Sequence, residues 1–288
     1  MVALSDYREV RVREWRIRAL DNLWSTKLQD QVLALVRAQA PAGHPQTIEL
    51  SHQIDGAEQR FFLKVFHRMT RLAAVKDQLR RSRALGSWQQ GLALAAAGFK
   101  VPLAIAVGSE SGWRVAKREF ILTAKIAGAP LTTYLGGDSA VRAAALSFKR
   151  ENIKSLGRLI RRFHEAGFVH GDLVATNIFV AADGTKNLEF YFMDNDRTRR
   201  YRSRLRYPFW KRNLIQLNRM PLAGISLQDR MVFLHAYLDV KQLCAADRRL
   251  ARWLEARTRQ RRKQCDGADP TVSFRRLMRW APEMAGRL

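Results

Sequence analysis

The sequence predicts an α+β protein of two lobes, the first rich in strands and the second rich in helices. Three observations support this fold class. The chain has 288 residues, which is long for one domain and suits two lobes. Short apolar strand-like runs dominate up to about residue 124, and amphipathic helical patterns dominate after about residue 147. We therefore expect a strand-rich lobe over residues 1–126 and a helical lobe over residues 127–288.

The first lobe follows the order strand, strand, helix, strand, strand, preceded by one further strand and one further helix. Apolar and charged residues alternate over Val10–Leu20, which predicts a half-exposed strand with a slip of phase near Glu14–Trp15. Asp55-Gly56 is a favourable hairpin turn. The remaining predicted elements are helices at Leu28–Ala38 and Arg71–Ala97, the latter ending at Gly98, and strands at Thr47–Ile54, Arg60–Phe66, Val101–Val107 and Glu119–Ala124.

The second lobe begins with the clearest helix of the chain, Ser147–Ala166, which Gly167 ends. His164 is expected on the exposed side of this helix, and Cys244 is expected in the core. Ser226 and Asp229 form a predicted capping box. The other predicted elements are strands at Asn177–Val180 and Leu188–Met193 with a turn at Asp183-Gly184, and helices at about 209–219, 227–238 and 240–263.

The charge balance predicts an anionic partner. Lys and Arg number 51 against 26 Asp and Glu, a formal net charge of +25. Such an excess points to nucleic acid, a phospholipid surface or a phosphate-bearing substrate. The two cysteines, Cys244 and Cys265, exclude a disulfide scaffold and fit a reducing compartment. The first residues lack the apolar core of a signal peptide, and the longest uncharged run, Ala84–Phe99, is too short and polar to span a bilayer, so we expect a cytoplasmic protein.

The stretch most informative about chemistry is His170-Gly171-Asp172-Leu173-Val174-Ala175-Thr176-Asn177, which follows the clearest helix and precedes a strand. The next strand ends in Met193-Asp194-Asn195-Asp196. Upstream, Lys64 lies on an otherwise apolar strand, where an unpaired ammonium group is costly to bury. His170 is expected to hydrogen-bond the loop backbone, and Asp196 is expected to pair with a nearby Arg rather than bind a second metal ion.

This pattern resembles the catalytic loop and metal-binding segment of protein-kinase-like phosphotransferases. The resemblance implies a protein-kinase-like fold with ATP and Mg²⁺ as cofactors. By the same resemblance Asp172 accepts the proton of the attacking hydroxyl, and Asn177 and Asp194 hold Mg²⁺. Lys64 corresponds to the strand lysine that grips the ATP phosphates. The first lobe would then bind nucleotide and the second would carry the catalytic loop.

The residues around these motifs are similar to the bacterial lipopolysaccharide kinases, the Kdo/heptose kinase family. The similarity covers roughly residues 58–265 and is carried by segments 97–102, 193–199, 212–214, 217–219 and 233–238. It implies an ATP-dependent kinase that phosphorylates a sugar hydroxyl of the lipopolysaccharide inner core. Such an enzyme would lie peripherally at the cytoplasmic face of the inner membrane.

Three departures from the protein-kinase pattern bear on this interpretation. No glycine-rich loop precedes Lys64. Residues 59–109 contain no Glu to pair with that lysine, and Asp77, Gln89 or Gln90 are the candidate substitutes. Val174 stands where protein kinases carry a Lys, which disfavours a protein substrate and suits a small-molecule or glycan acceptor.

A basic, aromatic-rich segment follows the proposed metal ligand. Residues 197–219 contain no acid and nine basic residues, Arg197, Arg199, Arg200, Arg202, Arg204, Arg206, Lys211, Arg212 and Arg219. We expect this segment to meet an anionic membrane and its glycan acceptor. Two alternatives stay open: a non-catalytic kinase-shaped module that binds anionic membrane or nucleic acid, and a soluble kinase of the aminoglycoside-phosphotransferase type. Nucleic acid is disfavoured because no known nucleic-acid-binding motif is present.

Overall fold

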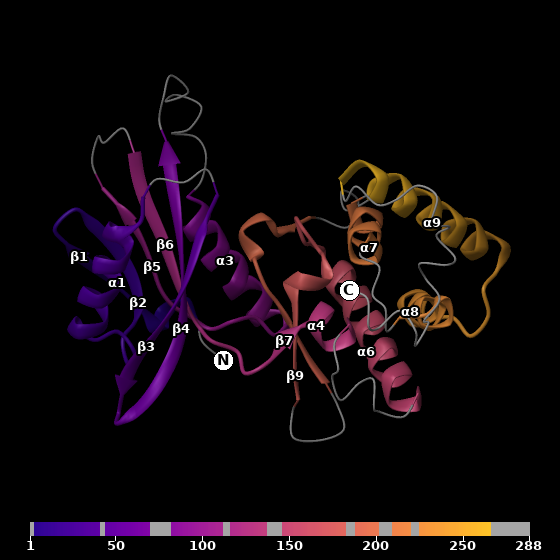
Figure 1. The fold of residues 1–288 in the computed structure, drawn as a ribbon, viewed down its shortest axis with the longest axis horizontal. Coiled ribbons are helices and arrows are strands. Elements are labelled where there is room, and N and C mark those ends of the chain that lie inside the picture. The colour runs from indigo at the N-terminus through magenta and orange to yellow at the C-terminus, as the bar shows by residue number, and fades with distance from the viewer. Residues whose placement is uncertain are drawn as a thin grey trace. The chain divides into compact units, whose positions relative to one another are not determined.

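The chain forms two compact units, which are drawn with their elements labelled in Figure 1. The first unit comprises Met1–Ile126 and Asp194–Arg197, and the second comprises Ala127–Met193 and Thr198–Leu288. The structure is a computed structural model. It describes residues 3–40, 44–69, 82–111, 116–136, 146–182, 188–201, 209–219 and 225–265.

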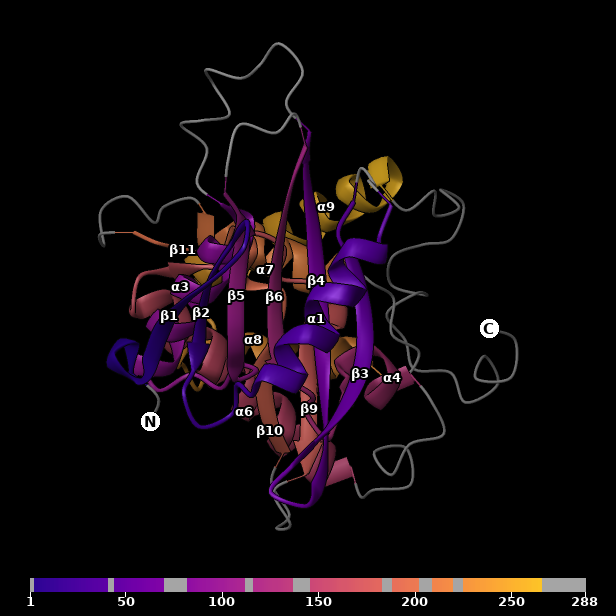
Figure 2. The same cartoon turned by 90° about the vertical axis from the view of Figure 1, so that its left-hand side faces the viewer.

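The first unit is built on a six-stranded sheet with the strand order β1-β2-β5-β6-β4-β3, visible in Figure 2. Each neighbouring pair in this sheet is antiparallel. β4 is its longest described strand, pairs on both sides, and carries Lys64. The strands are β1 (Tyr7–Val12), β2 (Trp15–Leu20), β3 (Gln46–Ile54), β4 (Ala57–Met69), β5 (Ala104–Glu110) and β6 (Ala116–Ala124).

Helices α1 (Thr26–Ala38) and α3 (Arg83–Ala96) cover opposite faces of this sheet, as Figure 1 shows. Leu63 and Val65 of β4 belong to the core that also contains four buried residues of α1. Phe66 packs instead with Trp88 of α3. Because side chains alternate along a strand, Lys64 lies on the same face as Phe66. The sequence of β4 therefore directs its one lysine to the α3 side of the sheet.

Two hairpins of the sheet turn through left-handed backbone. Asp55 and Gly56 have φ of 51° and 78°, which confirms the predicted turn between β3 and β4. The single strand expected over Val10–Leu20 is wrong, because β1 and β2 form a hairpin whose turn includes Arg13 at φ 50°. The slip of phase near Glu14–Trp15 marks this reversal of the chain. Of the helix expected over Arg71–Ala97, the part before residue 82 lies outside the described residues.

The second unit is mainly helical and contains two small sheets, with the strand orders β10-β9-β7 and β11-β8. Its helices confirm the predicted elements near 147–166, 209–219 and 227–238, and the last helix begins at Ala245 rather than near 240. The Asp183-Gly184 turn lies outside the described residues. Its elements are β7 (Ala129–Pro130), α4 (Leu131–Gly136), α6 (Leu146–Glu165), β8 (Phe168–Val169), the 3-10 turn η2 (Ala175–Asn177), β9 (Ile178–Ala182), β10 (Leu188–Phe192), β11 (Arg199–Arg200), α7 (Phe209–Arg219), α8 (Leu227–Leu238) and α9 (Ala245–Cys265).

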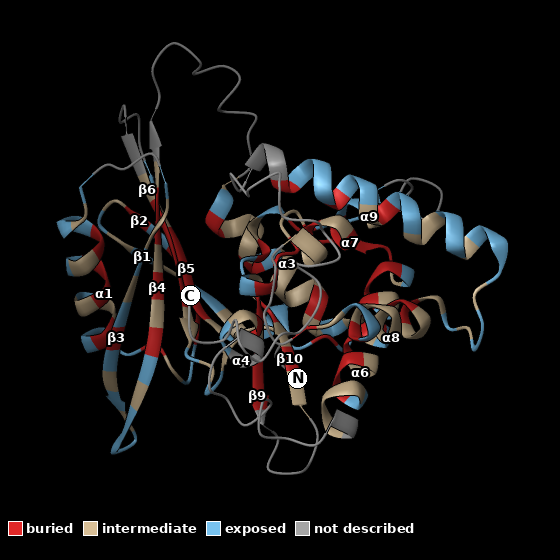
Figure 3. Ribbon diagram, turned by 45° about the vertical axis from the view of Figure 1, so that its right-hand side comes forward, coloured by how far each residue is buried: buried red, intermediate tan, exposed pale blue. Residues whose placement is uncertain are grey.

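Helix α6 is the centre of the second unit. Its apolar stripe is buried, and the Phe163 ring lies 4.5 Å from the Phe192 ring and 5.6 Å from the Phe168 ring. Figure 3 shows the buried positions of α6 beside those of α8. A Cβ atom at Gly157 would lie 2.7 Å from the carbonyl oxygen of Phe233, so glycine lets α6 and α8 approach closely.

Two side chains of the second unit lie where the sequence did not place them. His164 is 4% exposed instead of lying on the solvent side of α6. Its Nε2–H donates to Asn213 Oδ1 at 3.2 Å, and its Nδ1 accepts from the Tyr237 hydroxyl at 3.0 Å. Satisfied hydrogen bonds offset the cost of burying the imidazole. Cys244, expected in the core, is exposed, because it immediately precedes α9.

The capping box predicted at the start of α8 is present and is coupled to a buried ion pair. Ser226 Oγ accepts from the Asp229 N–H at 3.1 Å, and the Asp229 carboxylate accepts from the Ser226 N–H at 2.9 Å. Lys149 Nζ of α6 donates to Asp229 Oδ2 at 2.7 Å. Burial by itself raises the pKa of Asp229, but hydrogen bonds from Lys149 and Ser226 and the Lys149 charge outweigh burial and hold the pKa below its ordinary value.

We predict that Asp229→Asn lowers the free energy of unfolding at neutral pH and makes it less dependent on pH in the acidic range. The lowered pKa means that the ion pair stabilises the fold above the ordinary carboxyl pKa and loses this effect as the pH falls toward the folded-state value. Breaking the pair should cost about 3–5 kcal/mol at neutral pH. Urea unfolding from pH 7 to pH 3 measures this, with Asp239→Asn at the exposed C-cap that follows the same helix as control. Equal acid sensitivity of Asp229→Asn and the parent would contradict the prediction.

Candidate active site

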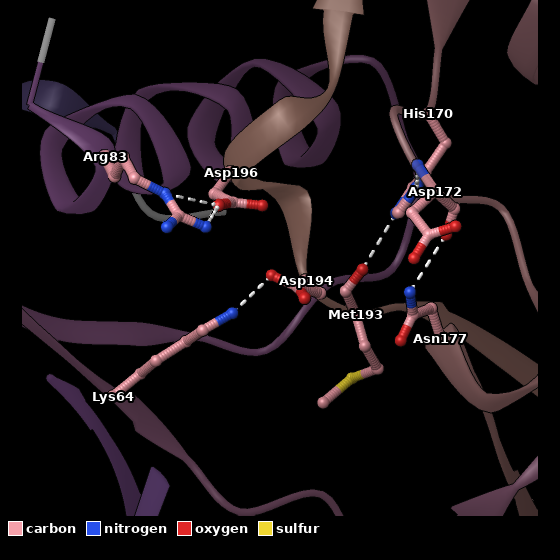
Figure 4. Close-up of polar contacts among 8 residues, drawn as sticks. All are labelled: Lys64, Arg83, His170, Asp172, Asn177, Met193, Asp194 and Asp196. Atoms are coloured by element: carbon pink, nitrogen blue, oxygen red, sulfur yellow. Dashed lines mark hydrogen bonds and ion pairs between the residues drawn. The ribbon is translucent and has the colours of Figure 1, made fainter. Parts of the chain in front are cut away.

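In the first unit, Lys64 and Asp194 form an ion pair, drawn in Figure 4. The Lys64 side chain is 22% exposed and that of Asp194 is 41% exposed. Asp194 adopts a left-handed backbone conformation with φ of 51°. Such strain in a non-glycine residue gathers at functional sites, and Asp tolerates it better than most residues. The sequence named Lys64 and Asp194 separately for phosphates and metal, and the structure brings them together.

The partner of Lys64 differs from the residues expected to replace the missing helix Glu. Lys64 pairs with Asp194 rather than with Gln89 or Gln90 of α3, and Asp77 lies outside the described residues. The carboxylate of Asp194, two residues after β10, thus provides the negative charge that a Glu on helix α3 would otherwise supply. Its position, immediately after a strand that is distant in sequence, explains why residues 59–109 held no signal of it.

A second ion pair lies two residues further along the chain. Asp196 Oδ2 accepts from Arg83 Nε of α3 at 3.0 Å, and the Asp196 side chain is only 4% exposed. This confirms the predicted salt bridge for Asp196. The Arg83 guanidinium also lies 5.0 Å from the centre of the Phe66 ring. Glu119 of β6, which the sequence did not single out, accepts the Arg83 backbone N–H at 2.9 Å and so caps the start of α3.

In the second unit, the loop before η2 is held by His170, as expected. The imidazole is 1% exposed, donates from Nε2 to the Met193 carbonyl oxygen at 2.8 Å, and accepts the Asp172 N–H at Nδ1 at 3.1 Å (Figure 4). These two contacts require the neutral ring with its proton on Nε2. His170 therefore shapes the loop and has no nitrogen left for proton transfer.

Helix α7 contributes two buried amides to this loop that sequence reasoning missed. Asn213 is fully buried; its Nδ2 donates to the His170 carbonyl oxygen at 2.6 Å, and its Oδ1 accepts the His170 N–H at 3.0 Å. Gln216, one helical turn later, also contacts the loop. A signal existed in the sequence: both are uncharged polar residues among the apolar positions of an amphipathic helix, where burial demands a partner.

Asn177, at the end of η2, has one side of its amide engaged. Its Nδ2 donates to the Asp172 carbonyl oxygen at 2.9 Å, an arrangement that leaves Oδ1 for another ligand. The described residues contain no group of three or more His, Cys, Asp or Glu arranged to hold a metal ion. Mg²⁺ needs no such group, since it takes one or two protein oxygens and completes its shell with phosphates and water. Asn177 offers an amide oxygen and Asp194 offers a carboxylate, and each is an oxygen ligand of the kind that Mg²⁺ prefers.

Comparison with known proteins decides the family. The pattern of the lipopolysaccharide kinase (Kdo/WaaP) family matches residues 49–237, which is more than half of the chain. The chain belongs to the lipopolysaccharide kinase (Kdo/WaaP) family. It is accordingly a phosphotransferase, and membership in a kinase family implies the use of ATP. No curated protein matches the sequence.

A solved structure supports the fold of this lipopolysaccharide kinase family member. The structure described as WaaP in complex with acyl carrier protein has a TM-score of 0.58 and 20% sequence identity, and the match covers 80% of this chain and 92% of that chain. At this identity the likeness concerns the fold, and it confirms the predicted kinase-like α+β class.

Proposed function

We propose that this kinase transfers the γ-phosphoryl group of ATP to a sugar hydroxyl of the lipopolysaccharide inner core, on Kdo or heptose. The observation that carries the proposal is the fixed backbone of Asp172, whose N–H donates to His170 and whose carbonyl oxygen accepts from Asn177. Both backbone groups of this residue are hydrogen-bonded, so its position is fixed. In a member of a kinase family, a carboxylate held in this way suits the role of general base.

The proposed reaction is an in-line phosphoryl transfer. The oxygen of the sugar hydroxyl forms a bond to the γ-phosphorus, the bond from that phosphorus to the β,γ-bridging oxygen breaks, and ADP leaves with the electron pair. The hydroxyl proton passes to the Asp172 carboxylate. Positioning and charge stabilisation supply most of the acceleration in this chemistry, which is why the loop geometry matters more than covalent catalysis.

Asp194 and Asn177 are the proposed Mg²⁺ ligands, and Lys64 is the proposed phosphate contact. Magnesium bound there would supply charge neutralisation on the phosphate oxygens. The ammonium group of Lys64 is held in place by its ion pair with Asp194, and the neighbouring strand residues Leu63 and Val65 are apolar and buried. No glycine-rich loop precedes Lys64 in the sequence. We therefore assign Lys64 as the main phosphate contact in the first unit.

We predict that Asp172→Asn lowers kcat by about 10²–10⁴-fold, because the hydroxyl loses its proton acceptor, while ATP affinity stays unchanged. Asp194→Asn should weaken Mg-ATP binding and turnover together. Phosphate transfer from Mg-ATP to deacylated core oligosaccharide measures both variants, with the exposed Asp30→Asn as control. Transfer at the parent rate by Asp172→Asn and Asp194→Asn would refute the assignment of these residues.

We predict that Lys64→Met weakens ATP binding without loss of folding, since methionine keeps the bulk of the strand residue and removes its charge. Calorimetric titration with Mg-ATP should show at least a tenfold weaker affinity. Lys125→Met is a matched control: Lys125 also pairs with a carboxylate, Glu49 at 2.6 Å, and lies 5.7 Å from the Phe62 ring. If Lys64→Met binds ATP with the same affinity as the parent and as Lys125→Met, Lys64 does not contact the nucleotide.

We also propose that the enzyme works peripherally at the cytoplasmic face of the inner membrane, where its acceptor is embedded. None of the described helices is long and apolar enough to cross a membrane. Helix α9 presents an exposed row, coloured pale blue in Figure 3. We call it the α9 basic face: Arg248, Arg249, Arg252, Arg257, Arg259 and Arg261. Trp253 in its middle is 39% exposed, and Lys211 Nζ of α7 lies 5.2 Å from its ring.

This surface combines cations with an interfacial aromatic side chain, the chemistry that favours an anionic headgroup layer. Of the 197–219 segment expected to dock, Arg199 and Arg200 are exposed, and residues 202–208 lie outside the described part of the chain. Each cation near an anionic bilayer contributes about 1 kcal/mol, so several together give reversible attachment.

We predict that replacing Arg248, Arg249, Arg252 and Arg257 with Gln abolishes co-sedimentation with vesicles containing phosphatidylglycerol at low salt. The KM for lipopolysaccharide should rise while Mg-ATP affinity is retained. Thermal melts control for folding, since exposed residues should tolerate the change within a few degrees. Undiminished vesicle binding would exclude the α9 basic face, and the corresponding variant of Arg199 and Arg200 then tests the other segment.

A further inference from the structure

The side chain of Gln216 makes a set of contacts that the fold alone does not require. It lies on α7 and is 7% exposed. Its Nε2 donates to Asp172 Oδ1 at 3.2 Å and to the Gly171 carbonyl oxygen at 3.3 Å. Its Oε1 accepts from Asn213 Nδ2 at 3.1 Å and from the Leu173 N–H at 3.4 Å.

These four contacts use the full capacity of a glutamine amide, which has two N–H donors and two acceptor sites. The orientation of the amide is therefore determined: a flipped amide would place its oxygen against the Asp172 carboxylate and its NH₂ against two donors. Three consecutive loop residues, Gly171, Asp172 and Leu173, are tied to one side chain. A rigid helix thus fixes the loop at the point where the proposed base lies.

The contact to Asp172 is to its side chain, whereas the neighbouring contacts are to its backbone. His170 and Asn177 hold the Asp172 N–H and carbonyl oxygen. Within the described residues, Gln216 is the hydrogen-bond donor to the Asp172 carboxylate, and it uses Oδ1. Oδ2 is thereby the oxygen that remains for an acceptor hydroxyl.

We infer that Gln216 is a positioning residue that fixes the rotamer of the Asp172 carboxylate and assigns Oδ2 as the oxygen that receives the proton. The inference rests on the proposed function, in which Asp172 is the general base. Its effect belongs to the chemical step, because a base displaced by a fraction of an ångström loses rate rather than substrate affinity.

The test is Gln216→Met, which keeps the volume and flexibility of the side chain and removes its hydrogen bonds. With Mg-ATP and deacylated core oligosaccharide, kcat should fall about tenfold or more, and both KM values should stay within about twofold. Asn218→Ala is the control: it removes another amide of α7, which contacts Thr258 at 3.2 Å and also Arg230 of α8, and does not contact the loop. It should leave kcat near the parent value.

Two further variants keep the inference falsifiable. Gln216→Glu preserves the oxygen that accepts from Leu173 and Asn213 and replaces only the donor, so it should fold and lose more rate than Gln216→Met at neutral pH through repulsion of Asp172. It also serves if Gln216→Met does not fold. In an Asp172→Asn background, Gln216→Met should cause no further loss, because the carboxylate it orients is gone.

The outcomes separate the two assignments. A folded Gln216→Met or Gln216→Glu with kcat within twofold of the parent overturns the inference, as does a loss in Gln216→Met that multiplies with that of Asp172→Asn. Full activity of Asp172→Asn instead overturns the general-base assignment itself. A large loss in Asp172→Asn with normal Gln216 variants leaves the proposed function standing and refutes only the role of Gln216.

Discussion

The N–H and C=O groups of buried irregular backbone must each be hydrogen-bonded. This constraint applies to the loop from His170 to Asn177. Backbone hydrogen bonds serve only part of it, in and just before the turn η2, and side chains bind other groups of its backbone. His170 satisfies the Asp172 N–H and the Met193 carbonyl oxygen, and Asn213 satisfies both backbone groups of His170. Removing any one of these partners would leave a buried group unpaired, which costs more than the hydrogen bond contributes. The loop conformation is therefore specified by a few side chains far away in sequence.

The first unit faces a different problem, the placement of a charged lysine on a strand between apolar neighbours. The Asp194 carboxylate offsets the cost of burying the Lys64 ammonium group. A second ion pair, between Asp196 and Arg83, binds the following residues to α3. Two successive residues have separate anchors here: the Met193 carbonyl oxygen is bound by His170 in the second unit, and Asp194 is bound by Lys64 in the first. The left-handed backbone at Asp194 accompanies this change of unit along the chain.

Only part of the positive charge is balanced by carboxylates within the fold. Some cations are structural: Lys149 neutralises the buried Asp229, and Arg83 neutralises Asp196. Others, such as Arg249 and Arg252, are exposed on α9 beside an exposed tryptophan. Under the proposed function a surface of this kind suits membrane attachment, because several weak contacts together are strong enough to recruit the enzyme and weak enough to release it.

Much of the fold could be predicted because its signals are local. The strand predicted over Arg60–Phe66, the Asp55-Gly56 turn, the stripe of α6 and the Ser226–Asp229 box each depend on neighbouring residues, and each is confirmed. The candidate residues Asp172, Asn177, Asp194 and Lys64 were found for a similar reason, since their spacing within short segments is the motif. The hairpin at Arg13 was missed because a two-residue turn without Gly, Asn or Asp resembles a slip in a continuous strand.

The sequence by itself determined the two-lobed α+β class, the family resemblance and the residues of the motif, because periodicity and motif spacing are properties of neighbouring positions. Only the tertiary structure decided which side chains complete the site. The pairing of Lys64 with Asp194, the burial of His164 and the contacts of Asn213 and Gln216 join positions many residues apart. The packing between elements decides which buried polar groups form hydrogen bonds with each other. Packing joins residues that are distant in sequence, so no local pattern encodes it.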